Sequence, residues 1–150
     1  MPKWRNRPVH LNIYGKGDDE DRLRIMLSDN DVKNITIHGY TNNVLKVWEK
    51  NHIIFMPSFM EGLPIALIGA IFCGRVPVVT DIGAHCEVIE DNKTGFIAKK
   101  PEVLDLDEAL ERAYSNLSRL EGIGKMGREK VLNLIPEDPV DDFIKKLLKI

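Results

Sequence analysis

Residues 53–80 read IIFMPSFMEGLPIALIGAIFCGRVPVVT and decide the fold. Two short apolar runs, Ile53–Met56 and Val76–Thr80, flank the nearly all-apolar stretch Pro64–Cys73. Short runs rich in β-branched residues predict buried strands, and the longer stretch between them predicts a helix that ends at Gly74. Residues 53–80 are therefore a strand–helix–strand unit, which joins two parallel strands of one sheet.

The same alternation continues on both sides of this unit. The predicted elements are strands at 9–14, 35–38 and 94–98 and helices at 19–28 and 44–50. Beyond residue 100 the apolar positions follow a helical period, and Pro136 and Pro139 precede the last helix. The sequence predicts an α/β fold, with a Rossmann-like, doubly wound parallel sheet, helices on both of its faces and a helical C-terminal tail. We expect residues 1–150 to form a single domain.

Composition excludes several classes of protein. The 21 Lys and Arg residues nearly balance the 23 Asp and Glu residues, so the net charge of −2 does not predict nucleic-acid binding. Cys73 and Cys86, the two cysteines, cannot build a disulfide framework, which favours a cytoplasmic location. The longest apolar run, Ile65–Cys73, is far shorter than the about 20 residues that a membrane helix needs. We expect no integral membrane segment.

Polar or glycine-rich segments follow four predicted strands, at the sheet end where parallel sheets bind ligands. The most informative segment is Pro57–Pro64. The free amides of Ile65 and Ala66, at the positive end of the next helix, suit a phosphate or diphosphate. Glu61 precedes them and could accept hydrogen bonds from a sugar hydroxyl. Its spacing fits equally well a glutamate that only stabilises the helix N-terminus.

The other segments carry weaker signals. Gly15-Lys-Gly17 could cradle a phosphate, but Glu20 replaces the third glycine of a dinucleotide-binding loop, which disfavours an oxidoreductase. The acidic run at 18–21 is better explained by the N-terminus of its own helix. His85 and Cys86 are adjacent in sequence, and no further His or Cys lies at ligand spacing, so we expect no metal site.

Three motifs, in this order and spacing, resemble the retaining glycosyltransferases of family 4. They are Pro57-Ser-x-x-Glu-Gly-x-Pro64, Gly74-Arg-Val-Pro-Val-Val79 and Glu87-x-Ile-x5-Gly-Phe96. The likeness is to the C-terminal domain, which binds the nucleotide-sugar donor, of the two-domain GT-B fold. It covers about residues 11–98, and the helical tail matches more loosely.

The resemblance implies transfer of a sugar from a nucleotide-diphosphate donor with retention of configuration. It also implies that no metal cofactor is needed and that the product is a cell-surface polysaccharide or glycolipid. Glu61 matches the first glutamate of the family's Glu-x7-Glu motif and is the expected catalytic residue. The remaining expected donor-binding residues are Gly15, Gly17, His38, Gly39, Tyr40, Ser58, Gly62, Leu63, Ile65, Ala66 and Gly69.

The chain departs from the family pattern in two ways. The second glutamate of the motif, which would hold the ribose hydroxyls, falls at Gly69. The family's opening strand, with its Gly-Arg-x4-Lys-Gly loop, and the N-terminal acceptor domain have no counterpart in residues 1–150.

These departures define two hypotheses about function. In the first, the chain is the donor half of a glycosyltransferase, inactive alone, that needs a separate acceptor domain or self-associates through an exposed sheet edge. In the second, it is a non-catalytic remnant that binds nucleotide weakly or binds another protein.

Overall fold

The structure is a computed structural model that describes residues 2–136 and 138–148. The chain forms two compact units, Met1–Val44 and Leu45–Ile150. Both are built from parallel strands and helices, so the predicted α/β class is confirmed. No helix of the described residues is long and apolar enough to cross a membrane.

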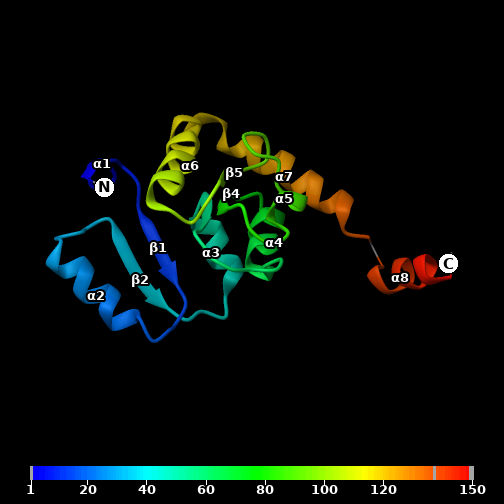
Figure 1. Cartoon of the computed structure of the whole chain (residues 1–150), viewed down its shortest axis with the longest axis horizontal. Helices are drawn as coiled ribbons and strands as arrows, with labels where there is room; N and C mark the ends of the chain where they lie inside the picture. Colours follow the sequence, from blue (N-terminus) through cyan, green and yellow to red (C-terminus); the bar gives the residue numbers. More distant parts are fainter. Residues whose placement is uncertain (1, 137, 149–150) are drawn as a thin grey trace. The chain divides into compact units, whose positions relative to one another are not determined.

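The first unit is a small layer of strands and helices (Figure 1). Its elements are α1 (Pro2–Arg5), β1 (Leu11–Tyr14), α2 (Glu20–Asp29) and β2 (Ile35–Gly39). β1 and β2 pair in parallel as a two-stranded sheet.

Polar side chains cross-link these two strands. His10 Nε2 lies 2.8 Å from Thr36 Oγ1, and His38 Nε2 lies 2.7 Å from Asn12 Oδ1. The His38 ring also stacks on Tyr14, with ring centroids 4.5 Å apart. The unit is therefore held by surface polar contacts as well as by its backbone ladder.

The second unit is larger and has three parallel strands in the order β3-β4-β5. Its elements in chain order are α3 (Val44–Lys50), β3 (Ile53–Met56), α4 (Ile65–Phe72), β4 (Val76–Thr80), α5 (His85–Val88), β5 (Phe96–Ala98), α6 (Val103–Ser115), the 3-10 helix η1 (Leu117–Arg119), α7 (Leu120–Leu134) and α8 (Pro139–Leu147).

Helices cover both faces of this sheet. Every residue of β4 is buried, as expected for the central strand of a parallel sheet. On one face Leu67 and Ile71 of α4 pack with Val131 of α7. On the other face Ala109 and Ala113 of α6 cover β4 and β5. The sheet is thus the middle layer of a three-layer unit.

The predicted strands are confirmed, with shorter ends in two places. Val9 and Thr94, each the first residue of a predicted strand, lie outside β1 and β5. Their amides donate to carbonyl groups two and four residues earlier, at Arg7 (2.8 Å) and Glu90 (2.9 Å). Local turns thus take the backbone donors that a strand would have used.

The helical pattern after residue 100 is also confirmed. The one difference in topology is that the strands pair as two sheets rather than one.

Glycine ends α4 as the sequence predicts. Gly74 has a φ of +70°, and its amide donates to the Ile71 carbonyl at 2.8 Å. The Arg75 amide donates to the Ala70 carbonyl at 2.9 Å, which completes a Schellman motif. The turn lies against α7, where a Cβ on Gly124 would overlap the Gly74 carbonyl group.

Alanine substitutions at two glycines of α7 test this close packing. We expect Gly124→Ala to lower the free energy of unfolding by roughly 1–3 kcal/mol, because the added methyl group meets backbone that cannot move aside. Gly122, two residues earlier, has open space around it, so Gly122→Ala should raise stability by up to about 1 kcal/mol. Urea denaturation measures both changes, and equal effects would contradict the contact.

Candidate functional site

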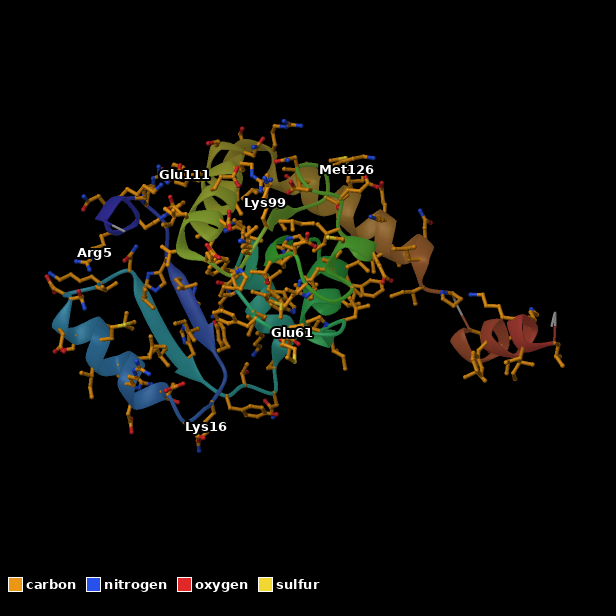
Figure 2. All side chains as sticks on the ribbon, viewed as in Figure 1. Arg5, Lys16, Glu61, Lys99, Glu111 and Met126 are labelled. Atoms are coloured by element: carbon orange, nitrogen blue, oxygen red, sulfur yellow. The ribbon has the colours of Figure 1, made fainter. Side chains whose placement is uncertain are left out.

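The loop between β3 and α4 carries Glu61 (Figure 2). The Ser58 hydroxyl donates a 3.3 Å hydrogen bond to Glu61 Oε1. Glu61 is exposed, and an exposed carboxylate can accept further hydrogen bonds from hydroxyl groups. Ser58 therefore orients a carboxylate that remains accessible to a ligand.

Two hydrogen bonds tie this loop to the carboxyl end of β4. The Thr80 hydroxyl donates to the Ser58 carbonyl at 2.8 Å. The Ala84 amide donates to the Gly62 carbonyl at 3.1 Å. The loop is thus attached to β4 on one side of Glu61 and to the segment after β4 on the other.

Gly83 makes the second of these attachments sterically possible. Its φ of +53° lies in the left-handed region, and a Cβ at this position would overlap the carbonyl oxygens of Glu61 and Gly62. Only glycine allows the two loops to approach so closely. Two of the four segments that the sequence singled out, 57–64 and 81–87, are therefore brought together.

The start of α4 presents free backbone donors. Pro64 is the residue before the helix rather than its first residue, with φ −65° and ψ 130°. Its carbonyl accepts from the amides of Leu67 and Ile68 at 3.0 and 3.2 Å. The amides of Ile65 and Ala66 precede these and have no acceptor within the helix. They carry the positive end of the helix dipole, which favours an anion.

Apolar side chains near Glu61 in sequence are exposed. Phe59 and Met60 are 81% and 88% exposed, and Ile65 is 90% exposed. Leu63 is 45% exposed. The loop therefore presents apolar surface together with the Glu61 carboxylate and the helix amides.

His85 and Cys86 do not form a thiol–imidazole pair. His85 is fully buried, and its Nδ1 lies 2.8 Å from the Thr80 carbonyl. The exposed Cys86 thiol donates to Asp81 Oδ1 at 2.8 Å. Over the described ranges, no group of three or more His, Cys, Asp or Glu side chains could hold a metal ion.

Five further residues of the predicted site belong to the first unit. Gly15 and Gly39 have φ values of +137° and +74°, and the Gly15 amide donates to the Gly39 carbonyl at 2.8 Å. Gly17 helps to line a hollow of about 470 Å³ beside Gly15. Tyr40 is 78% exposed, whereas His38 is engaged with neighbouring side chains. The ends of β1 and β2 are thus joined at two glycines.

Gly69 faces a tryptophan. A Cβ at Gly69 would lie 3.9 Å from Trp48 Nε1, which is ordinary van der Waals distance. The indole N–H is buried and, within the part of the chain that the structure describes, has no hydrogen-bond partner. The helix can therefore accept a larger residue at this position, and a side chain with an oxygen could pair with the indole.

Thr80 and Gly83, which hold the site together, were not among the predicted site residues. Thr80 ends an apolar strand and Gly83 lies in the short polar segment after it, a pattern that marks a turn but does not show what the turn contacts. Their partners lie about twenty residues earlier in the chain, so only the folded structure reveals the contacts.

These features define the class of protein. It is an α/β protein with parallel sheets and with glycine-rich and polar loops at the carboxyl ends of its strands, an arrangement typical of nucleotide-binding folds. The family model for glycosyl transferases group 1 matches residues 1–130. The chain therefore belongs to this family.

Curated relatives align with this sequence over most of its length. The poly(ribitol-phosphate) alpha-N-acetylglucosaminyltransferase of Staphylococcus aureus is 26% identical over 148 residues. The match covers 97% of this chain and 29% of that enzyme. The putative colanic acid biosynthesis glycosyltransferase WcaL of Escherichia coli is 26% identical over 149 residues, covering 91% of this chain and 36% of WcaL. The chain thus spans about a third of the relatives it matches.

Solved structures agree with the family and the fold. The crystal structure of TarM superposes with a TM-score of 0.80 at 26% identity, covering 96% of this chain and 29% of TarM. An S. aureus TarM mutant in complex with Fondaparinux, alpha-GlcNAc-glycerol and UDP gives a TM-score of 0.82 at 25% identity over the same shares of each chain. The fold is that of GT-B glycosyltransferases.

The bond between Cys86 and Asp81 makes a measurable prediction. The hydrogen bond to Asp81, with burial and the nearby negative charge, raises the pKa of the Cys86 thiol to about 11. A raised thiol pKa means less thiolate at any pH below it, so Cys86 should react slowly with iodoacetamide at mildly alkaline pH. In Asp81→Asn the pKa should fall and Cys86 should react about tenfold faster or more.

Mass spectrometry of each cysteine measures this rate. Cys73, which is half-buried at the C-terminal end of α4, is the internal control and should react at the same rate in both proteins. An unchanged Cys86 rate in the variant would contradict the proposed cause of the pKa shift.

Proposed function

We propose that this chain is the donor-binding part of a retaining, family 4-like glycosyltransferase. The observation that carries the proposal is Glu61, oriented by Ser58 and tied to β4, just before the free amides of Ile65 and Ala66. A carboxylate beside an anion-binding helix end suits a ligand with sugar hydroxyls next to a diphosphate.

The relatives support a UDP-linked sugar as the donor. One of the TarM structures contains UDP, and the S. aureus relative is named as an N-acetylglucosaminyltransferase. The relatives named for colanic acid and amylovoran biosynthesis support a role in making a surface polysaccharide. Cys73 and Cys86 are free thiols, which is compatible with a cytoplasmic location.

Each candidate residue has a proposed role. The amides of Ile65 and Ala66 bind the diphosphate, which removes the need for a metal cofactor. Glu61 accepts hydrogen bonds from the donor sugar, and Ser58 keeps its carboxylate in place. His38 and Tyr40 contact the nucleobase.

The remaining donor-binding positions act through their backbone. Gly15, Gly17, Gly39, Gly62 and Leu63 shape the loops at the strand ends, where small or backbone groups let a ligand approach closely.

Sugar transfer also needs an acceptor-binding part, which we propose is a separate domain. The alternative, a non-catalytic remnant, is favoured by Gly69, where the family's second glutamate is missing. Calorimetry with UDP distinguishes the two, because a remnant whose site has decayed should bind no nucleotide at millimolar concentration.

The first test concerns the sugar contact. Glu61→Gln keeps the shape of the side chain and removes its charge, so it should weaken binding of UDP-N-acetylglucosamine about tenfold or more. Binding of UDP, which lacks the sugar, should change little. Calorimetric titration of both ligands separates the two effects.

The matched control is Glu121→Gln, which removes an exposed carboxylate from the first turn of α7. This variant should bind both ligands like the natural chain. An equal loss of UDP and UDP-sugar affinity in Glu61→Gln would contradict a sugar-specific role for Glu61.

The second test restores the missing glutamate. Gly69→Glu should tighten UDP binding about tenfold or more, because two hydrogen bonds from ribose hydroxyls to a carboxylate are regained. Space for the Cβ exists beside Trp48.

Gly69→Ala is the control, since it changes helix propensity but adds no carboxylate. Only the glutamate variant should gain affinity. If both variants bind UDP like the natural chain, the ribose site has drifted at more than this one position.

A further inference from the structure

His85 is a buried polar side chain with one unpaired ring nitrogen. It is fully buried, and within residues 2–136 and 138–148 its Nε2 has no hydrogen-bond partner. An unpaired polar atom in the core lowers stability, so an apolar side chain would fill this position more favourably. The position therefore needs a group that an apolar side chain lacks, and the other ring nitrogen, Nδ1, supplies it.

The Nδ1 atom of His85 binds the main chain at the end of β4. It lies 2.8 Å from the Thr80 carbonyl oxygen, and because a carbonyl oxygen only accepts, Nδ1 carries the hydrogen and donates it. The Ile82 amide donates to the same carbonyl at 3.0 Å, and the His85 amide donates to the Ile82 carbonyl at 3.2 Å. The histidine side chain thus closes residues 80–85 into a compact loop.

Both hydrogen bonds that hold the Glu61 loop come from the ends of this compact loop. Near its start, the Thr80 hydroxyl donates to the Ser58 carbonyl at 2.8 Å. Near its end, the Ala84 amide donates to the Gly62 carbonyl at 3.1 Å. The bond from the histidine ring to the first of these residues sets the spacing between the two donors, and Glu61 lies between the residues that they hold.

A continuous series of hydrogen bonds also leads from the buried ring to the exposed carboxylate. His85 holds the Thr80 carbonyl, the Thr80 hydroxyl holds the Ser58 carbonyl, and the Ser58 hydroxyl donates to Glu61 Oε1 at 3.3 Å. All four residues belong to the second unit. A change at the buried ring can therefore alter where the Glu61 carboxylate lies.

We infer that His85 is a positioning residue for Glu61. Its Nδ1 hydrogen fixes the Thr80 carbonyl, and the loop that this bond closes carries the two donors that hold Glu61 in place. The effect on a sugar donor rests on the proposed function, whereas the placement of the loop does not depend on any ligand.

Amide hydrogen exchange in the ligand-free chain, read by NMR, tests the placement of the loop. His85→Leu and His85→Phe both remove the Nδ1 donor, and their different shapes keep the test available if one of them fails to fold. Exchange at the Ala84 amide should become about tenfold faster in both, because its bond to Gly62 opens more often. His85→Asn places an amide donor at the same number of bonds from the backbone, so most of the protection should return.

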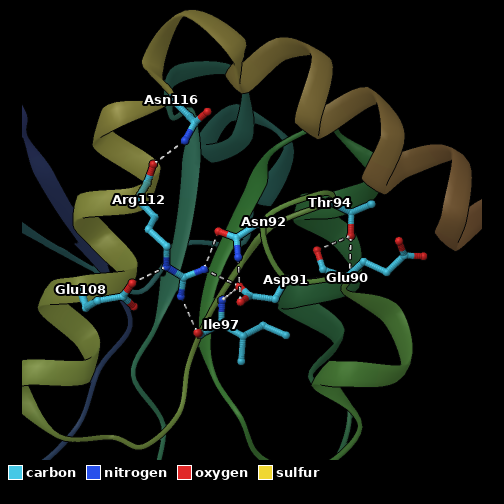
Figure 3. A network of polar contacts seen from close by, with 8 residues as sticks. All are labelled: Glu90, Asp91, Asn92, Thr94, Ile97, Glu108, Arg112 and Asn116. Atoms are coloured by element: carbon cyan, nitrogen blue, oxygen red, sulfur yellow. Dashed lines mark hydrogen bonds and ion pairs between the residues drawn. The ribbon is translucent and has the colours of Figure 1, made fainter.

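Two controls separate this effect from a general loss of stability. The Arg75 amide, which donates to the Ala70 carbonyl after α4, should change little in any of these variants. Thr94→Val removes another buried side-chain group that binds the main chain, since Thr94 Oγ1 accepts from the Glu90 amide at 2.8 Å (Figure 3). This variant should leave exchange at Ala84 as it is in the natural chain.

Calorimetry with UDP-N-acetylglucosamine measures the consequence for Glu61. His85→Leu should bind this ligand about tenfold more weakly and bind UDP almost unchanged, and His85→Asn should recover most of the loss. Added to Glu61→Gln, His85→Leu should cost no further affinity, because it acts through Glu61. A purely structural role would lower the affinity for both ligands and would add to the loss in Glu61→Gln.

Several results would overturn the inference. Unchanged exchange at Ala84 in the variants without the donor, equal acceleration at Arg75, or no recovery in His85→Asn would each show that the Nδ1 bond does not hold the loop. Additive losses with Glu61→Gln would show that His85 does not act through Glu61. If the natural chain binds no UDP-sugar, the proposed function fails, while the exchange rates still decide whether His85 positions the loop.

Discussion

The attachment of the β3–α4 loop to the end of β4 is the constraint on which the candidate site depends. Thr80 and Ala84 donate to the carbonyl groups of Ser58 and Gly62, and Glu61 lies between these two attached residues. Each such bond contributes only about 1 kcal/mol to stability. Together with the backbone contact at Gly83, however, they hold the loop at two points, so the carboxylate has little freedom to move away.

The helix after the loop connects this site to the core. Leu67 and Ile71 of α4 are buried against the sheet, while the first amides of the same helix are free. At its other end, the Gly74 turn lies against Gly124 of α7. A helix held by buried side chains along one face and by the Gly74 turn presents its N-terminal donors in a defined direction, which is what recognition of an anion requires.

Side chains protect one edge of the sheet in this unit. Asp91 and Arg112 close β5 by hydrogen bonding to the backbone of Ile97, and the side chains of β3 pack on both faces of the sheet.

The sequence by itself determined the order and type of the elements. Short apolar runs such as 53–56 and 76–80 indicate buried strands, and Gly74 indicates the end of the helix between them. Motif spacing likewise placed Glu61 before a helix N-terminus. Only the tertiary structure decided that the strands pair as two sheets and that Thr80 and Gly83 hold the Glu61 loop. It also decided that Trp48 lies beside Gly69. These contacts join residues about twenty positions apart, and contacts at that separation leave no periodic pattern from which they could be read.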